Sequence, residues 1–215
     1  MRFRSRQHAA QLLADRLSAD YKNENPLILG IPRGALPMAE IIADALGGEL
    51  DVVLVHKLGH PNQPEFAIGA IDESGSAFLA EWAAELEPEC LEEEKQRQLA
   101  VLRRRRAQYT PLRPPIDPFG RIVIVVDDGI ATGSTMIAAL RAVRARKPKK
   151  LVCAVAVASP EAARAMSREA DKIVCLTVPA DFFAVGQYFE DFAQVTDEEV
   201  GVILERHKAA GAVAG

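Results

Sequence analysis

Cysteine is scarce in this sequence of 215 residues, and the three thiols present lack the spacing of a metal site or a disulfide framework. Cys153 and Cys175 lie within apolar runs, where a thiol behaves as a small hydrophobic side chain. We therefore predict that these two side chains and Cys90 are reduced and structural, as is usual in a cytoplasmic protein.

Long apolar runs and an excess of basic residues are missing as well. No apolar run approaches the roughly 18 residues of a membrane-spanning helix, and residues 1–16 are charged and amphipathic, unlike a signal peptide. The formal net charge of −4 argues against a nucleic-acid-binding protein, which usually carries a basic stripe. We expect a protein that is neither secreted nor inserted into a membrane.

A basic cluster, Arg103 to Arg106, is nevertheless present. It follows the acidic residues Glu92 to Glu94 within the same helix-like segment. Charges of both signs on one helix indicate a solvated face first. A contact between two copies of the chain is a second interpretation, and an RNA site is a third.

Strand-like and helix-like segments alternate along the chain, which is the pattern of a parallel sheet covered on both faces. Hydrophobic residues make up 49% of the sequence, enough for one continuous core. The predicted fold is a single α/β domain spanning residues 1–215, with an open, mainly parallel five-stranded sheet and helices on both faces. The expected strands are residues 27–31, 50–55, 122–126, 151–157 and 173–176. The expected helices are residues 6–17, 35–45, 87–109, 134–144 and 160–169.

Two further parts of the chain do not follow this alternation. Residues 57–118 form an expected insertion that contains a hairpin at 66–71, a long polar helix at 87–109 and a Pro-rich link at 111–118. Residues 178–195 are rich in Phe and in acidic side chains. We predict that this last segment forms a hood over the strand ends, where open parallel sheets bind their ligands.

The most informative stretch is residues 127–135, which read Asp-Asp-Gly-Ile-Ala-Thr-Gly-Ser-Thr. The stretch follows the apolar run 122–126, an expected central strand, and opens a helix-like segment. A loop of small residues at a helix amino terminus presents free backbone N–H groups to a phosphate. The two carboxylates beside it fit a ligand that also carries hydroxyl groups and arrives with a divalent cation.

Two commoner phosphate motifs do not match this stretch. A Walker A loop has four residues between its glycines and a Lys after them, whereas Gly129 and Gly133 are separated by three residues and no Lys follows. A dinucleotide fingerprint needs three glycines and an acid about 20 residues further on. Hydrolases of the haloacid dehalogenase type also place Asp after a strand, but they require Asp-x-Asp rather than Asp-Asp-Gly.

The stretch instead resembles the phosphoribosyl diphosphate binding motif of type I phosphoribosyltransferases: an apolar strand, two acids and a short loop ending in Thr-Gly-x-Thr. The resemblance implies that Asp127 and Asp128 contact the ribose hydroxyls, hold Mg²⁺ and act in catalysis. It also implies that a phosphate-binding loop holds the 5′-phosphate. The residues of this loop are Ala131, Thr132, Gly133, Ser134 and Thr135.

One geometric condition follows from the two adjacent acids. Neighbouring residues of a strand point to opposite faces of the sheet. If both carboxylates share one ligand, we therefore expect the strand to end at Asp127 and the chain to turn there. Gly129 would permit that turn.

Two other segments resemble parts of the same family. Residues 30–34 resemble its pyrophosphate loop, which implies that Arg33 and the backbone at Gly34 face the diphosphate. Lys57 stands where the flexible loop of the family begins. The turn-rich residues 60–65 would then close over the bound diphosphate.

The hood segment resembles the part of the family that stacks a nucleobase. Its stacking candidates are Phe182, Phe183 and Tyr188. Glu190 and Asp191 could accept hydrogen bonds from exocyclic amines of the base.

The resemblance implies a Mg²⁺-dependent enzyme whose partners are phosphoribosyl diphosphate and a nucleobase or related nitrogen acceptor. Such a transfer passes through an oxocarbenium-like ribose and needs no covalent residue, in keeping with the lack of a nucleophile–base motif. Hypoxanthine-guanine enzymes carry an acid where this chain has Ala131, so the acceptor stays open. The alternative is a regulatory protein that binds the ligand without transfer. Dimers are common in the family, and the helix at 87–109 offers a surface for a homodimer.

Overall fold

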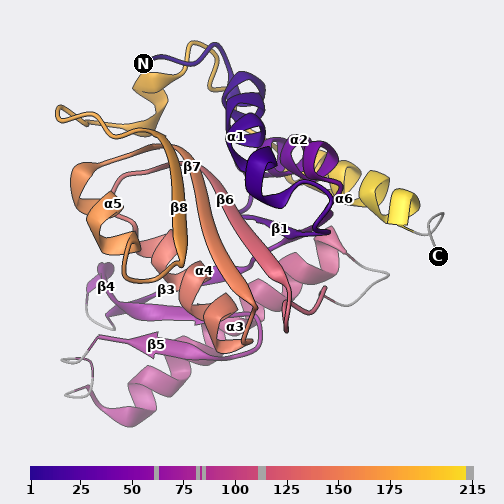
Figure 1. Ribbon diagram of the computed structural model, residues 1–215. Helices are drawn as coiled ribbons and strands as arrows, with labels where there is room; N and C mark the ends of the chain where they lie inside the picture. Colours follow the sequence, from indigo (N-terminus) through magenta and orange to yellow (C-terminus); the bar gives the residue numbers. More distant parts are fainter. Residues whose placement is uncertain (61–62, 81–82, 84–85, 111–114, 212–215) are drawn as a thin grey trace.

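A computed structural model describes residues 1–60, 63–80, 83, 86–110 and 115–211. At its centre lies a parallel five-stranded sheet in the order β2-β1-β6-β7-β8 (Figure 1). The strand bounds are Glu49–Val52 for β2, Leu27–Gly30 for β1, Ile122–Ile130 for β6, Lys150–Ala158 for β7 and Lys172–Thr177 for β8. The predicted open α/β sheet is confirmed.

Helices cover both faces of this sheet, also as predicted. Alternate residues of β6 pack into two different clusters of buried side chains: Ile124 and Val126 join α1 and α2, whereas Val123 and Val125 join α4 and α5. The helix bounds are Arg6–Tyr21 for α1, Leu36–Leu46 for α2, Ser134–Ala145 for α4 and Pro160–Met166 for α5. No helix in the described part of the chain is both long and apolar enough to cross a membrane.

The strand order reverses between β1 and β6. After β1 the chain adds β2 on one side, whereas β6, β7 and β8 extend the sheet on the other side. In register, Gly30 is paired with Val52 on one side and with Val126 on the other. Loops at the carboxyl ends of β1 and β6 diverge at such a switch point and leave a crevice between them.

The inserted region contains a second, antiparallel sheet of β3 (Val55–His60), β4 (Gln63–Asp72) and β5 (Ala77–Leu79). The predicted hairpin at 66–71 is thus present as part of β4, which pairs with both of its neighbours. The predicted strand 50–55 is wrong in its extent, because β2 ends at Val52 and β3 begins at Val55. Lys57 lies within β3, opposite Ala70, and does not begin a loop.

Residues 61–62 of the predicted closing loop and residues 111–114 of the predicted link lie outside the described residues. The long helix of the insertion, α3, spans Pro88–Tyr109, close to the predicted 87–109. In Figure 1 this helix lies beside the antiparallel strands, at the lower end of the view.

The carboxy-terminal helix α6, Asp197–Gly211, is an element that the sequence analysis missed. It begins with a capping box, because Thr196 Oγ1 accepts from Glu199 N–H while a Glu199 carboxylate oxygen accepts from Thr196 N–H. The predicted hood before it is mostly irregular and contains one short 3-10 helix, η2, at Val185–Tyr188. That residues 1–215 form a single domain stays a prediction.

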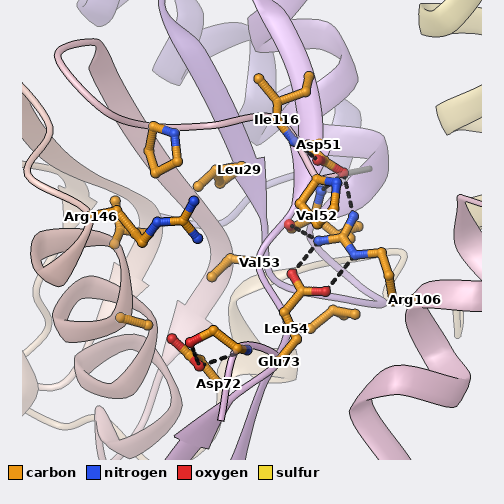
Figure 2. A pocket seen from close by; sticks show the side chains of 15 residues that line it. Leu29, Asp51, Val52, Val53, Leu54, Asp72, Glu73, Arg106, Ile116 and Arg146 are labelled. Atoms are coloured by element: carbon orange, nitrogen blue, oxygen red, sulfur yellow. Dashed lines mark hydrogen bonds and ion pairs between the residues drawn. The ribbon is translucent and has the colours of Figure 1, made fainter. Parts of the chain in front are cut away.

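A buried ion-pair network fixes α3 to both sheets (Figure 2). Arg106 donates from Nη1 to Asp51 at 2.8 Å, from Nη2 to the Val52 carbonyl oxygen at 3.1 Å and from Nε to Glu73 at 2.6 Å. The side chain of Asp51 is 1% exposed and that of Arg106 is 12% exposed. The network therefore joins α3 to the end of β2 and to the turn that follows β4.

We expect Arg106→Met to lower the free energy of unfolding by about 3 kcal/mol, because it removes the guanidinium from a buried carboxylate. Urea unfolding followed by circular dichroism measures the change. Arg104→Met is the matched control, since Arg104 is an exposed residue of the same helix, and its effect should stay below about 0.5 kcal/mol. Similar values for the two variants would show that the network does not anchor α3.

Candidate active site

The acid pair lies toward the carboxyl end of β6, where the neighbouring strand β1 stops. The pairing with β1 ends at Val126, whose carbonyl oxygen accepts a hydrogen bond from Ile31 N–H at 3.0 Å. A cavity of about 630 Å³ opens beyond this point. Both Asp127 and Asp128 line it.

The expectation that the strand ends at Asp127 is wrong. β6 continues to Ile130 and stays paired with β7, with Asp127 opposite Val155 and Gly129 opposite Val157. The two carboxylates therefore start from opposite faces of the strand. They reach one cavity because β1 has ended, which leaves that edge of β6 open toward both faces.

A guanidinium from the first helix neutralises one of the two acids. Arg6 Nε lies 2.8 Å from Asp128 Oδ2, and Arg6 Nη1 donates to the Ala193 carbonyl oxygen at 2.6 Å. The same guanidinium lies 3.8 Å from the centre of the Phe192 ring, in cation–π geometry. Arg6 thus ties the acid pair to α1 and to the end of the hood.

The first cavity brings together several predicted site residues: Arg33, Gly34, both acids and Thr135. Its other lining residues come from α1, from the loop after β1, from α3 and from the segment around the start of α6. These are Arg6, Ile31, Pro32, Arg105, Phe192, Gln194, Val195 and Asp197.

A second cavity of about 520 Å³ adjoins the first. It is lined by three hydroxyl residues of the phosphate-binding loop, Thr132, Ser134 and Thr135, and by Lys57 from β3. The two cavities share four lining residues and so lie next to each other. The shared residues are Ile31, Pro32, Arg105 and Thr135.

The phosphate-binding loop is held from behind by the next strand–helix connection. Gly133 adopts φ 85°, a left-handed conformation that favours glycine, and it caps the amino terminus of α4. Ser159 Oγ donates to the Ala131 carbonyl oxygen at 2.7 Å, and Ser159 N–H donates to Ile130 at 2.9 Å. Ala131 and Gly133 therefore shape the loop, although neither lines the two cavities.

The loop after β1 faces the acid pair across the crevice. Its Pro32–Arg33 peptide bond is cis. Arg33 Nη1 lies 3.7 Å from an oxygen of Asp197, at the start of α6. A Cβ at Gly34 would lie 2.5 Å from Asp128 Oδ2, so only glycine leaves room for that carboxylate.

The predicted stacking residues of the hood do not line either cavity. The rings of Phe182 and Tyr188 stack on each other with centroids 5.7 Å apart, and both pack against the core on the side of α1 and α2. Phe183 is 88% exposed. The aromatic residue that does line the site is Phe192, close after the two acids proposed to meet a base, Glu190 and Asp191.

Both carboxyl groups of the acid pair have a raised pKa. Burial raises the pKa of the Asp127 carboxyl well above its ordinary value, and the negative charge of Asp128 raises it further. Burial also raises the pKa of Asp128, an effect that Arg6 opposes. A bound cation would favour the ionised form of both groups.

Among the described residues, no group of three or more His, Cys, Asp and Glu side chains could hold a metal ion. Mg²⁺, however, is commonly bound by one or two carboxylates together with water and the phosphates of a substrate. Asp127 and Asp128 supply such oxygen donors on the wall of the cavity. The residues present therefore fit a magnesium ion that a phosphorylated ligand helps to hold.

Comparison with known proteins identifies the family to which this chain belongs. Residues 4–191 match the model of the phosphoribosyl transferase domain. The chain belongs to this family. The resemblance that residues 127–135 indicate is thereby confirmed.

Individual relatives agree with the family assignment. Two Mycobacterium tuberculosis proteins, whose names place them provisionally among the phosphoribosyl transferases, are each 40% identical over 216 residues, which cover 99% of this chain. The alignment covers 48% of each of those proteins, so the chain spans about half the length of the curated relatives that it matches. The crystal structure of TT1426 from Thermus thermophilus is 48% identical, with a TM-score of 0.87 over 96% of this chain and 99% of that one.

Several lining residues of this phosphoribosyl transferase domain were missed from sequence. Arg6, Phe192 and Asp197 carry no motif, and each lies more than 60 residues from the acid pair along the chain. Asp197 had one available signal, because Thr196 and Glu199 form a recognisable capping box at the start of α6. Arg105 was visible as part of a basic cluster, but the pattern indicated a solvated face.

We expect Asp127→Asn to stabilise the ligand-free protein at neutral pH. With its raised pKa, the folded carboxyl retains a proton that the unfolded chain releases above about pH 4, so wild-type stability falls as the pH rises through that interval. Asn has no proton to lose, and the variant should therefore melt at least about 2 °C higher at pH 7. Thermal melts in metal-free buffer between pH 4 and 7 measure the difference.

The difference should shrink toward pH 4, where the carboxyl of the unfolded wild-type chain becomes protonated as well. Asp181→Asn is the control, because Asp181 is exposed and its replacement should leave the melting temperature unchanged. A lower melting temperature for Asp127→Asn at pH 7 would contradict the assigned direction of the pKa shift.

Proposed function

We propose that this chain transfers ribose 5-phosphate from phosphoribosyl diphosphate to a nucleobase or related nitrogen acceptor, in a Mg²⁺-dependent reaction that releases diphosphate. The observation that carries the proposal is the adjacency of the two cavities. A phosphate-binding loop at a helix amino terminus and a pair of carboxylates open into adjoining cavities that share Thr135 and Pro32. A ligand with phosphate at one end and hydroxyl groups beside it matches this arrangement.

In this proposal, the 5′-phosphate binds to the hydroxyls of Thr132, Ser134 and Thr135 and to the first N–H groups of α4. Ala131 and Gly133 contribute backbone to the same loop. Asp127 and Asp128 accept hydrogen bonds from the ribose hydroxyls. The same carboxylates stabilise the positive charge that develops on the ribose ring as the diphosphate departs.

The leaving group is neutralised from the opposite wall. Arg33 and the backbone at Gly34 face the diphosphate on one side, and Lys57 faces it from β3 on the other. Asp127 and Asp128 would help to hold Mg²⁺, which would supply positive charge to offset the leaving diphosphate. The bond from ribose C1 to the diphosphate oxygen breaks with its electrons leaving on oxygen. The acceptor nitrogen then bonds to C1 and releases its proton to water.

The acceptor class is proposed from the family, and one residue narrows it. Ala131 stands where hypoxanthine-guanine enzymes have an acid that takes a proton from the base, which argues against a 6-oxopurine. The proposed base contacts include Phe182, Phe183 and Tyr188 in the hood, although these side chains lie outside the two cavities. The ring of Phe192 on the cavity wall offers a further stacking surface.

A panel of purines, pyrimidines and small amines, each incubated with phosphoribosyl diphosphate and Mg²⁺, tests the proposal by the release of diphosphate. With the acceptor that reacts best, Asp127→Asn combined with Asp128→Asn should lower kcat/KM by at least about 100-fold, because charge stabilisation at the ribose is lost. Asp181→Asn, on the surface, serves as the matched control and should leave kcat/KM unchanged.

Full activity of the double variant would contradict the assignment of the acid pair. The regulatory alternative, in which the site binds its ligand without transfer, predicts a different result. In that case none of the acceptors would cause release of diphosphate, although the protein would bind phosphoribosyl diphosphate tightly. Failure to bind phosphoribosyl diphosphate at all would reject both functions.

A further inference from the structure

Arg105 of α3 occupies a position that the phosphate-binding motifs do not include. It lines both cavities, together with Ile31, Pro32 and Thr135. We propose, building on the proposed function, that Arg105 binds the diphosphate of phosphoribosyl diphosphate. The inserted helix then supplies a substrate-binding residue to the crevice of the parallel sheet.

The charges around Arg105 support an anionic ligand. The described lining of the second cavity includes two cations, Lys57 and Arg105, and no Asp or Glu. Within the described part of the chain, the Arg105 guanidinium forms no ion pair and no hydrogen bond. Its neighbour Arg106, by contrast, is paired with both Asp51 and Glu73, and Arg33 lies beside Asp197. Among the described residues of the two cavities, Arg105 is therefore the arginine whose charge no acidic side chain already offsets.

The helix that carries Arg105 is fixed by two side chains that follow this residue, Arg106 and Tyr109. Arg106 joins it to β2 and to the turn after β4, as the dashed contacts of Figure 2 show. One turn later, the Tyr109 hydroxyl donates to Asp197, the acid that also lies 3.7 Å from Arg33. These contacts hold the last turn of α3, and with it the exposed Arg105, beside the crevice.

The position of Arg105 favours the diphosphate over the 5′-phosphate. The 5′-phosphate already has the loop hydroxyls and the amino terminus of α4 as its ligands in the proposed function. Arg105 shares both of its cavities with Pro32, in the loop that presents Arg33, and it lines the second cavity together with Lys57. A diphosphate carries more negative charge than these two cations offset, and a guanidinium binds phosphate oxygens in pairs.

Isothermal titration with inorganic diphosphate in the presence of Mg²⁺, and separately with ribose 5-phosphate, tests the inference without relying on catalysis. We expect Arg105→Ala to weaken diphosphate binding by about tenfold or more and to leave ribose 5-phosphate binding within about twofold. Arg105→Lys, which retains the charge but not the paired donors, should fall between wild type and Arg105→Ala.

Arg104→Ala is the matched control, because it removes the same charge from an adjacent exposed residue that lines neither cavity. It should leave both affinities unchanged. An equal loss of diphosphate affinity in Arg104→Ala would mean that only the net charge of the helix matters, and the inference would be overturned. Unchanged diphosphate binding in Arg105→Ala, or an equal loss for ribose 5-phosphate, would also overturn it.

Failure of the inference about Arg105 can be distinguished from failure of the proposed function. If wild-type protein transfers ribose 5-phosphate and Arg105→Ala binds diphosphate as tightly as wild type, the inference about Arg105 fails alone. If wild-type protein catalyses no transfer but Arg105→Ala still loses diphosphate affinity selectively, the inference stands and the catalytic proposal fails.

Discussion

Two adjacent carboxylates near the carboxyl end of a buried strand repel each other unless a proton or a positive charge offsets them, and the rest of the site is organised around that need. Burial and mutual repulsion raise the pKa of Asp127, and Arg6 offsets the charge of Asp128 through an ion pair of 2.8 Å. Gly34 leaves the space that the Asp128 carboxylate occupies. In the ligand-free protein, the raised pKa of Asp127 favours a retained proton, and a bound cation would take over this compensation.

The cations of the site come from parts of the chain that are distant in sequence. Arg6 lies on the first helix, Arg33 in the first strand–helix loop, Lys57 in the antiparallel sheet and Arg105 on the inserted helix. The insertion is therefore more than a covering element. Its buried Arg106 network ties α3 to the edge of the parallel sheet, and this attachment brings Arg105 to the crevice.

Part of the first cavity is lined by residues that follow the family match. The phosphoribosyl transferase domain model covers residues 4–191, whereas Phe192, Gln194, Val195 and Asp197 line the first cavity. The segment that follows the family match thus forms part of the wall of the first cavity. Differences between members in this segment would alter the cavity without changing the shared motif at the end of β6.

The sequence by itself determined the parallel sheet, the strand–loop–helix unit of residues 122–144 and the identity of the acid pair, because each depends on local patterns of apolar and small residues. It did not determine that β6 runs past the acids to Ile130, since that extension depends on pairing with β7. Arg6, Phe192 and Asp197 reach the cavity only because helices and loops distant along the chain pack beside the strand ends. Such contacts leave no periodic signal in the sequence, and the tertiary structure alone decides them.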